Sequence, residues 1–309
     1  SSFNAEERRA QQSRLTATNV AQPALGLVEA AAFDMLSRFK LQPAMAAGHS
    51  FGELVALYAS GRLSKEELGT LSAARGALMA GDGSDRGTMM AVLAPLNEIE
   101  LLVNEGELDV VLANRNSPAQ GVLSGSREAI ARAQELCEER GLDARPLEVG
   151  AAFHSSMVSG VRDDFAAVVA SCLLPEGRFP VIANSTGRSY PENALDAGSL
   201  LSGQLAESVH WVESIRTMYT QGARTFVEVG PGRTLSGMVG RTLDGQNHRC
   251  LALDASKGRK DGLLDLAELL AVLAAEGHSL DLSGWQDCPL PMPREPKMVV
   301  PITGANVRD

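Results

Sequence analysis

The strongest constraint on this chain is the run Gly48-His49-Ser50-Phe51-Gly52, which has the G-x-S-x-G spacing of a nucleophile elbow. In such a turn a strand reverses sharply into a helix and lifts the serine hydroxyl clear of the backbone. The apolar run 44–47 suits a buried strand, and residues 53–59 suit a helix that ends near Gly61. We expect both glycines to be needed, because a Cβ at either would crowd the turn. Ser50 is therefore a predicted nucleophile at a helix N-terminus, where free N–H groups can stabilise an oxyanion.

Composition excludes several classes of protein. The 309 residues can bury a sizeable core, but they contain no apolar run long enough to span a bilayer and no signal peptide. The net charge is −10 and no dense basic run occurs, which argues against nucleic-acid binding. The four cysteines are far apart and form no C-x-x-C pair. We therefore expect no metal site, reduced thiols and a cytoplasmic protein.

Residues 88–149 follow a rhythm of their own. We expect helices over 97–103 and 127–140, and strands over 89–93, 109–113, 121–124 and 144–149. The resulting order, βαββαβ, is the ferredoxin-like pattern. An insertion of this kind returns its two ends close together to the main domain.

The flanking segments alternate between helices and strands. We expect a polar, solvated helical face near the N-terminus, an amphipathic helix over 22–39, a helix that runs from the capping box at Ser64–Glu67 to Met79, and helix–strand pairs over 161–172 with 180–183 and over 212–221 with 225–229. This alternation is typical of a parallel sheet with helices on both faces. The Gly/Asp-rich stretch 81–85 is a predicted loop. The tail from Cys288 carries five prolines and is a predicted surface linker.

A serine nucleophile needs a base, and the chain has five histidines. We expect the ring of His49 to point away from the neighbouring hydroxyl, His248 and His278 to lie on the surface, and His210 to stand at a helix start. His154 follows the last strand of the inserted segment and so re-enters the main domain at an interdomain cleft. It is the favoured base, with a packed structural histidine as the alternative.

Arg75 lies on the next helix, among small and apolar residues. A buried arginine needs an anionic partner. The residues alone leave two partners open, an internal carboxylate and the carboxylate of a ligand.

Five motifs together resemble the malonyl-CoA:acyl-carrier-protein transacylase family. They are Gly48–Glu53, Arg75 twenty-five residues after Ser50, Phe153-His154-Ser155, Gln204-Leu205 before Val209-His210-Trp211, and Glu228-Val229-Gly230-Pro231-Gly232. The resemblance covers the chain from Gln22 to about Arg241. The segments 3–8 and 21–25, and the tail at 299–303, are similar to acyltransferase domains of iterative polyketide synthases of the enediyne and polyunsaturated-fatty-acid type.

The resemblance implies an α/β fold with a hydrolase-like parallel-sheet core and an inserted ferredoxin-like subdomain. We expect the core to comprise residues 1–86 and 150–287, the subdomain residues 87–149, and the C-terminal linker residues 288–309. It also implies an excised acyltransferase domain that works beside a ketosynthase and other domains of one megasynthase.

The resemblance further implies a role for each matching residue. Ser50 would form a malonyl ester from malonyl-CoA, and His154, held by the backbone carbonyl of Gln204, would shuttle the proton. The acyl group would pass to the phosphopantetheine thiol of an acyl carrier protein, with no permanently bound cofactor. The substrate-binding residues would be Arg75 for the malonyl carboxylate, the Phe51 N–H for the oxyanion, Phe153 for malonyl over methylmalonyl preference, and Gln22, Asn116 and Asn184. The last two match polar pocket residues of the family, although turn or strand-end asparagines explain them equally well.

Two departures from the family pattern bear on these expectations. The N-terminal strand and the G-Q-G-S-Q loop that supplies the second oxyanion-hole amide do not precede Ser1. The histidine that often stands three residues before the catalytic one is Ala151 here, so the malonyl preference rests on Phe153. Two alternatives stay open: a serine thioesterase or other hydrolase, which has no need of Arg75, and a non-catalytic docking domain of a megasynthase.

Overall fold

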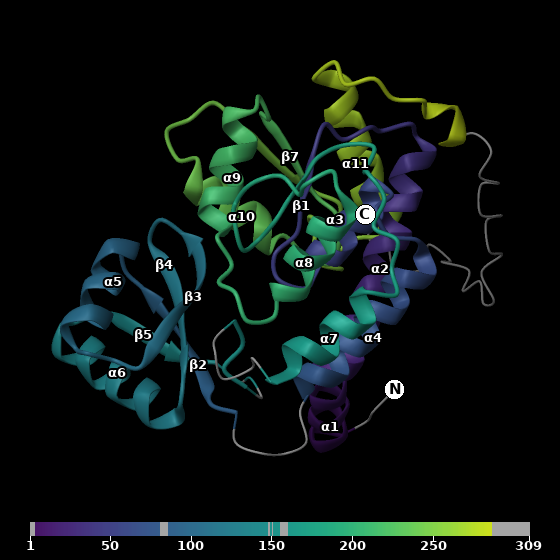
Figure 1. Cartoon of the computed structure of the whole chain (residues 1–309). Coiled ribbons are helices and arrows are strands. Elements are labelled where there is room, and N and C mark those ends of the chain that lie inside the picture. The colour runs from purple at the N-terminus through teal and green to yellow at the C-terminus, as the bar shows by residue number, and fades with distance from the viewer. Residues whose placement is uncertain (1–3, 81–85, 148, 150, 155–159, 286–309) are drawn as a thin grey trace, which may run out of the picture.

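The computed structural model describes residues 4–80, 86–147, 149, 151–154 and 160–285. The predicted loop at 81–85, the proline-rich linker at 288–309 and Ser155 of the histidine motif lie outside these residues. Figure 1 shows two parts: β2 to β5 with α5 and α6 stand to one side, and the remaining helices and strands form the larger body.

The strand–turn–helix at the G-x-S-x-G run is confirmed. β1 (Ala46–Ala47) leads into the turn, and α3 (Gly52–Ser60) leaves it. Ser50 between them has a φ of 49°, a left-handed value that a side chain rarely adopts. A Cβ on Gly48 would lie 2.0 Å from the backbone of Gly52, so glycine is required there. The expectation for Gly52 is wrong: it begins a helix, and a Cβ there meets no described atom within 4 Å.

Two helices pack tightly against each other beside the elbow. α2 (Thr18–Arg38) begins four residues earlier than predicted and contains Pro23 in its second turn. α4 (Lys65–Ala80) begins at the predicted capping box: Ser64 Oγ accepts the Glu67 N–H at 3.1 Å, and Glu67 Oε2 accepts the Ser64 N–H at 2.7 Å. At Gly76 a Cβ would lie 2.6 Å from the Thr18 carbonyl oxygen. This close approach fixes α4, which carries Arg75, against α2.

The larger body contains parallel strand pairs with helices on both faces, as predicted. β1 pairs with β6 (Val181–Ile182), and β7 (Thr225–Glu228) pairs with β8 (Arg249–Ala252). On one face, α9 (Trp211–Thr220) and α10 (Thr234–Thr242) pack through an apolar cluster that includes Ile182 and Phe226. On the other, α11 (Gly262–Ala275) and the end of α2 pack against Val227 and Leu251.

The inserted segment has the ferredoxin-like topology. Its elements are β2 (Thr88–Leu93), α5 (Leu96–Glu105), β3 (Val110–Ser117), β4 (Gln120–Gly125), α6 (Arg127–Glu139) and β5 (Asp143–Pro146). The sheet order is β3-β4-β2-β5 and all neighbours are antiparallel, which is the arrangement that a split βαβ repeat produces. The two helices and the sheet enclose a separate apolar core.

One strand of the insertion is joined directly to the larger body. The N–H of Val209 donates to the Ala113 carbonyl at 2.8 Å, and the N–H of Arg115 donates to the Val209 carbonyl at 2.9 Å. His210 then donates its N–H to the carbonyl of Asn184, just after β6. These bonds bring the end of β3 to the elbow.

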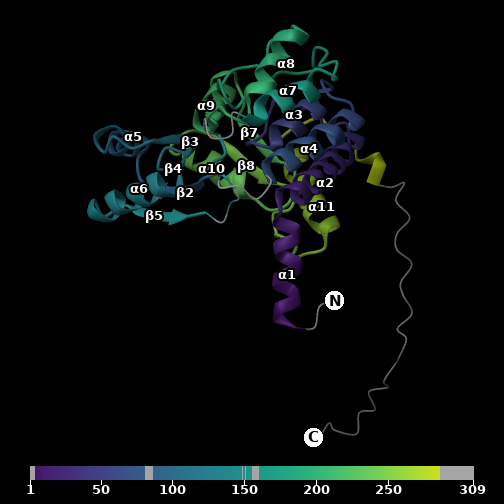
Figure 2. The same ribbon diagram turned by 60° about the horizontal axis from the view of Figure 1, so that its bottom comes forward.

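Several elements were not predicted or have other bounds. α8 (Ala194–Gly203), α10, β8 and α11 were not predicted, and α7 (Arg162–Val169) is shorter than expected. α1 (Ala5–Thr16) is exposed along its length and projects from the body (Figure 2), while η2 (Leu282–Trp285) ends the described chain. None of the helices in the described part combines the length and apolar composition that a membrane span requires.

Candidate active site

Ser50 and His154 meet in space although 104 residues separate them in the chain. Ser50 Oγ lies 2.9 Å from His154 Nε2. The elbow lifts Ser50 toward the histidine, and His154 has a left-handed φ of 57°. The predicted pairing of nucleophile and base is therefore present as a hydrogen bond.

The other ring nitrogen of His154 faces two backbone carbonyls. Nδ1 lies 2.9 Å from the Glu207 carbonyl oxygen and 3.2 Å from that of Gln204. Carbonyls only accept, so Nδ1 carries the hydrogen and Nε2 is free to accept the proton of Ser50. Burial, together with the charge of Arg75, lowers the pKa of His154 to about 3. The ring is thus neutral at neutral pH.

Arg75 is completely buried (0% exposed) and points at the same serine. Its Nη2 donates to Ser50 Oγ at 3.0 Å, and its Nε donates to Gln204 Oε1 at 3.1 Å. Burial lowers its pKa to about 10, and the charge of Glu53 opposes that shift. No carboxylate among the described residues forms a salt bridge with Arg75, so the internal-carboxylate alternative is not realised as a direct pair.

Gln204 reaches the site through its side chain as well as its backbone. The residue caps the C-terminus of α8. Its backbone carbonyl faces His154, as expected, while its Nε2 donates to the Ser50 carbonyl at 2.6 Å. The contact of the side chain with Arg75 was not expected. One residue therefore touches the base, the nucleophile and the guanidinium.

Two buried residues of this network were missed by the sequence analysis. Glu53 Oε2 accepts from Gln204 Nε2 at 2.8 Å, and Glu53 Oε1 accepts from the Tyr190 hydroxyl at 2.7 Å. A signal for Glu53 was available: it is the one charged residue in the otherwise apolar run of α3. Tyr190 carries no comparable signal.

The two asparagines brace the elbow. Asn184 Oδ1 accepts the Ser50 N–H at 2.8 Å, and its Nδ2 donates to the Gly48 carbonyl at 2.6 Å. Asn116 Oδ1 lies 2.7 Å from His49 Nε2. The His49 ring also packs edge-on against Trp211, so it faces away from Ser50 Oγ, as predicted.

The remaining predicted residues line the surroundings of the elbow. The Phe51 N–H donates to no acceptor among the described residues and stands at the N-terminus of α3. Phe51 and Phe153 belong to the same buried apolar cluster. Gln22 is buried on α2, where its Nε2 contacts Met79 Sδ at 3.1 Å, one helical turn beyond Arg75, and its Oε1 has no described partner.

The other histidines lie where they were predicted to lie. His210 caps the start of α9, His278 is exposed, and His248 bonds only locally, to the carbonyl of Gln246. In the described part of the chain, no group of three or more histidine, cysteine, aspartate or glutamate side chains could hold a metal ion.

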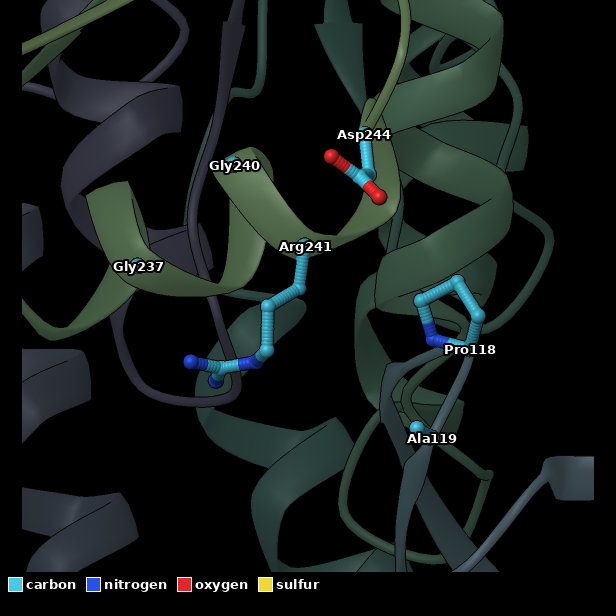
Figure 3. A pocket seen from close by; sticks show the side chains of 6 residues that line it. All are labelled: Pro118, Ala119, Gly237, Gly240, Arg241 and Asp244. Carbon is cyan, nitrogen blue, oxygen red and sulfur yellow. The ribbon is translucent and has the colours of Figure 1, made fainter.

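A pocket of about 380 Å³ lies elsewhere, between the β3–β4 turn and α10. Figure 3 shows Pro118 and Ala119 of the turn facing the helix from which Arg241 projects. It contains none of the predicted site residues. The chemistry therefore centres on the buried cluster around Ser50, which presents an activatable hydroxyl, a neutral base and a fixed cation.

Comparison with known proteins agrees with this cluster. The profile of the acyl transferase domain family matches residues 7–275. The malonyl CoA-acyl carrier protein transacylase of Bacillus subtilis is 35% identical over 232 residues, which are 73% of this chain and 73% of that protein. A polyunsaturated fatty acid synthase of a Thraustochytrium species contains a polypeptide that is 31% identical over 282 residues, or 89% of this chain. This chain spans 10% of the length of that polypeptide.

A solved structure shows the same fold. The acyltransferase domain of an iterative polyketide synthase in enediyne biosynthesis superposes with a TM-score of 0.77, at 28% identity, over 89% of this chain and 70% of that one. The match of the family profile along most of the chain, the identity to a transacylase of similar size and the shared fold lead to one conclusion. The chain belongs to the acyl transferase domain family.

Proposed function

We propose that this chain transfers malonyl from malonyl-CoA to the phosphopantetheine thiol of an acyl carrier protein through a malonyl ester on Ser50. The observation that carries the proposal is the double hydrogen bond at Ser50 Oγ, to His154 Nε2 at 2.9 Å and from Arg75 Nη2 at 3.0 Å. The base prepares the hydroxyl for attack. The guanidinium places a cation beside the acyl group that the hydroxyl would receive.

The first half-reaction uses the neutral form of His154. Nε2 takes the Ser50 proton as Oγ attacks the thioester carbonyl, and the oxyanion forms near the Phe51 N–H. The tetrahedral intermediate collapses, the carbon–sulfur bond breaks, and the CoA thiolate receives the proton from Nε2. In the second half-reaction the carrier thiol gives its proton to Nε2 and attacks the ester. Ser50 Oγ then leaves and recovers that proton.

Arg75 supplies the preference for a carboxylated acyl group. A guanidinium binds a carboxylate through two parallel hydrogen bonds, and burial strengthens such a pair. Phe153 would narrow the space at the α-carbon and favour malonyl over methylmalonyl. In this proposal Gln22 extends the polar lining near Met79, and Asn116 and Asn184 hold the elbow.

We also propose a setting for the domain. The relatives named above support a place within a polyketide or polyunsaturated-fatty-acid synthase in the cytoplasm, beside a ketosynthase and a carrier protein. The enediyne type is one specific form of this proposal. The division into residues 1–86 with 150–287, 87–149 and 288–309 is part of it, and the self-contained antiparallel sheet supports the middle segment.

Transfer to a carrier protein tests the function directly. The chain is incubated with malonyl-CoA and a phosphopantetheinylated carrier protein, and the intact masses of both proteins are measured. We expect a malonyl adduct on the carrier that depends on the chain. Release of free malonate without carrier loading would support the thioesterase alternative. The absence of any acyl adduct would support the docking-domain alternative.

A further inference from the structure

A buried carboxyl group lies directly behind the elbow. Glu53 is 1% exposed. Its Oε1 accepts from the Tyr190 hydroxyl at 2.7 Å and from the Asn184 N–H at 3.1 Å, and its Oε2 accepts from Gln204 Nε2 at 2.8 Å. All three partners are donors, which is the environment of a carboxylate rather than a carboxylic acid. Burial raises the pKa of Glu53, while these bonds and the charge of Arg75 oppose the rise.

The side-chain amide of Gln204 has one favourable orientation. Nε2 donates to Glu53 Oε2 and to the Ser50 carbonyl, and Oε1 accepts from Arg75 Nε. If the amide were reversed, its NH₂ group would face the Nε–H of Arg75, and its oxygen would face two other acceptors. Each reversed contact would leave a buried polar group without a partner, which is costly. Glu53 and the Ser50 carbonyl therefore fix the amide.

The amide in turn fixes Arg75. Nε and Nη2 lie in the plane of the guanidinium, and their contacts are Gln204 Oε1 and Ser50 Oγ. Because two contacts in one plane set its orientation, the loss of the Nε contact would let the group rotate. No described carboxylate could replace it by a direct ion pair.

We propose that Glu53 is a positioning residue for Arg75: its carboxylate orients the Gln204 amide, and the amide oxygen holds the guanidinium in place to receive an acyl carboxylate. This inference rests on the proposed function, in which Arg75 binds the malonyl carboxylate. It adds a residue that never touches the substrate to the determinants of acyl selectivity.

The variant Glu53→Gln tests the charge while keeping the shape. Its amide can offer an oxygen to only one side, so either Gln204 Nε2 or the Asn184 N–H loses its acceptor. Tyr190→Phe is the matched control. It removes one donor from the same carboxylate and leaves the contact with Gln204. Thermal unfolding of both variants establishes that they fold, and Gln204→Met, which removes the amide but keeps the backbone carbonyl, is a second test if Glu53→Gln does not.

The first readout needs no catalysis. Isotope-labelled arginine gives an Nε–H signal for Arg75 in the full chain, assigned by its loss in Arg75→Lys. We expect hydrogen exchange at this group to accelerate at least about tenfold in Glu53→Gln and Gln204→Met, and to stay within about twofold of the wild type in Tyr190→Phe. Wild-type exchange in Glu53→Gln, or in Gln204→Met, would overturn the inference.

The second readout is the ratio of malonyl to acetyl loading from the two CoA thioesters. We expect this ratio to fall about tenfold in Glu53→Gln and in Gln204→Met, with no further loss in the double variant, because both act along one path. An equal loss of both loadings would show that Glu53 merely supports the elbow and would overturn the inference. If the wild type forms no malonyl adduct, the proposed function fails, whereas the exchange readout still judges the positioning of Arg75.

Discussion

Arg75 Nη2 donates a hydrogen bond to Ser50 Oγ over 3.0 Å, although the two residues stand on different helices. The guanidinium is completely buried, and its net charge has no directly paired carboxylate among the described residues. A buried cation costs free energy unless an anion accompanies it. The site is therefore electrostatically suited to an acyl group that brings its own negative charge to the serine.

Replacement of Arg75 by alanine should change which acyl group is loaded. Malonyl loading should weaken by roughly 2–5 kcal/mol, the loss typical of a broken buried charge pair. Acetyl loading forms no such pair and should fall little. The measurement is the malonyl-to-acetyl ratio for the wild type and the variant side by side, with Arg75→Lys as a charge-preserving control. An unchanged ratio would reduce Arg75 to a structural role and favour the thioesterase alternative.

Replacement of His154 by alanine should slow self-acylation from malonyl-CoA by about 10²–10⁴, because the serine loses its base. Rapid-quench mass measurement gives the rate. His248→Ala is the control, since that ring bonds only to a nearby carbonyl, and it should acylate normally. Normal acylation by the His154 variant, or unfolding of that variant alone, would favour the packed structural histidine.

The rate of acylation should keep its plateau well into the acid range. Burial and Arg75 lower the pKa of His154 to about 3, so the ring stays neutral and able to accept a proton. A histidine with an ordinary pKa near 6.5 would lose about thirtyfold in rate between pH 8 and pH 5. We expect a change of less than about threefold over the same range. An acid limb with its midpoint near pH 6.5 would contradict this account of the site.

Replacement of Glu29 by glutamine should stabilise the fold at alkaline pH. Burial and the charge of Glu228 raise the pKa of Glu29 to about 7. The native state therefore holds a proton that the unfolded chain has lost, and stability falls as pH rises from about 4.5 to about 7. The neutral variant should gain about 1–2 kcal/mol at pH 8 and nothing at pH 4.5, after allowance for partial exposure.

Thermal unfolding at both pH values measures that gain. Glu139→Gln, on the exposed side of α6, is the control and should show no pH-dependent gain. An equal shift at both pH values would mean that Glu29→Gln acts through packing rather than through charge.

Local features of this fold were predictable because neighbouring residues determine them. The capping box at Ser64 and Glu67 is closed by two hydrogen bonds within four residues, and the elbow turn is fixed by the lack of room at Gly48. The βαββαβ order also follows from alternating patterns along one segment. In contrast, β8 and α11 follow a Gly/Asn-rich and a Ser/Lys-rich stretch that the sequence analysis treated as featureless surface.

The site could be predicted only in part. The residues alone selected Ser50 and favoured His154, but 104 positions separate them, so no local pattern sets their distance. The resemblance to a family supplied the backbone role of Gln204. It did not supply the contact of its side chain with Arg75 or the buried carboxylate of Glu53, since both depend on how three distant helices pack.

Acylation of Ser50 is the most direct test of this account. The chain is incubated with malonyl-CoA, and the modified residue is located by mass analysis of its peptides, for the wild type and for Ser50→Ala. We expect one malonyl group on the peptide that contains Ser50 and none on the alanine variant, whose fold is checked by thermal unfolding. A malonyl adduct that persists on the Ser50→Ala chain, or a wild-type adduct on another residue, would contradict the account.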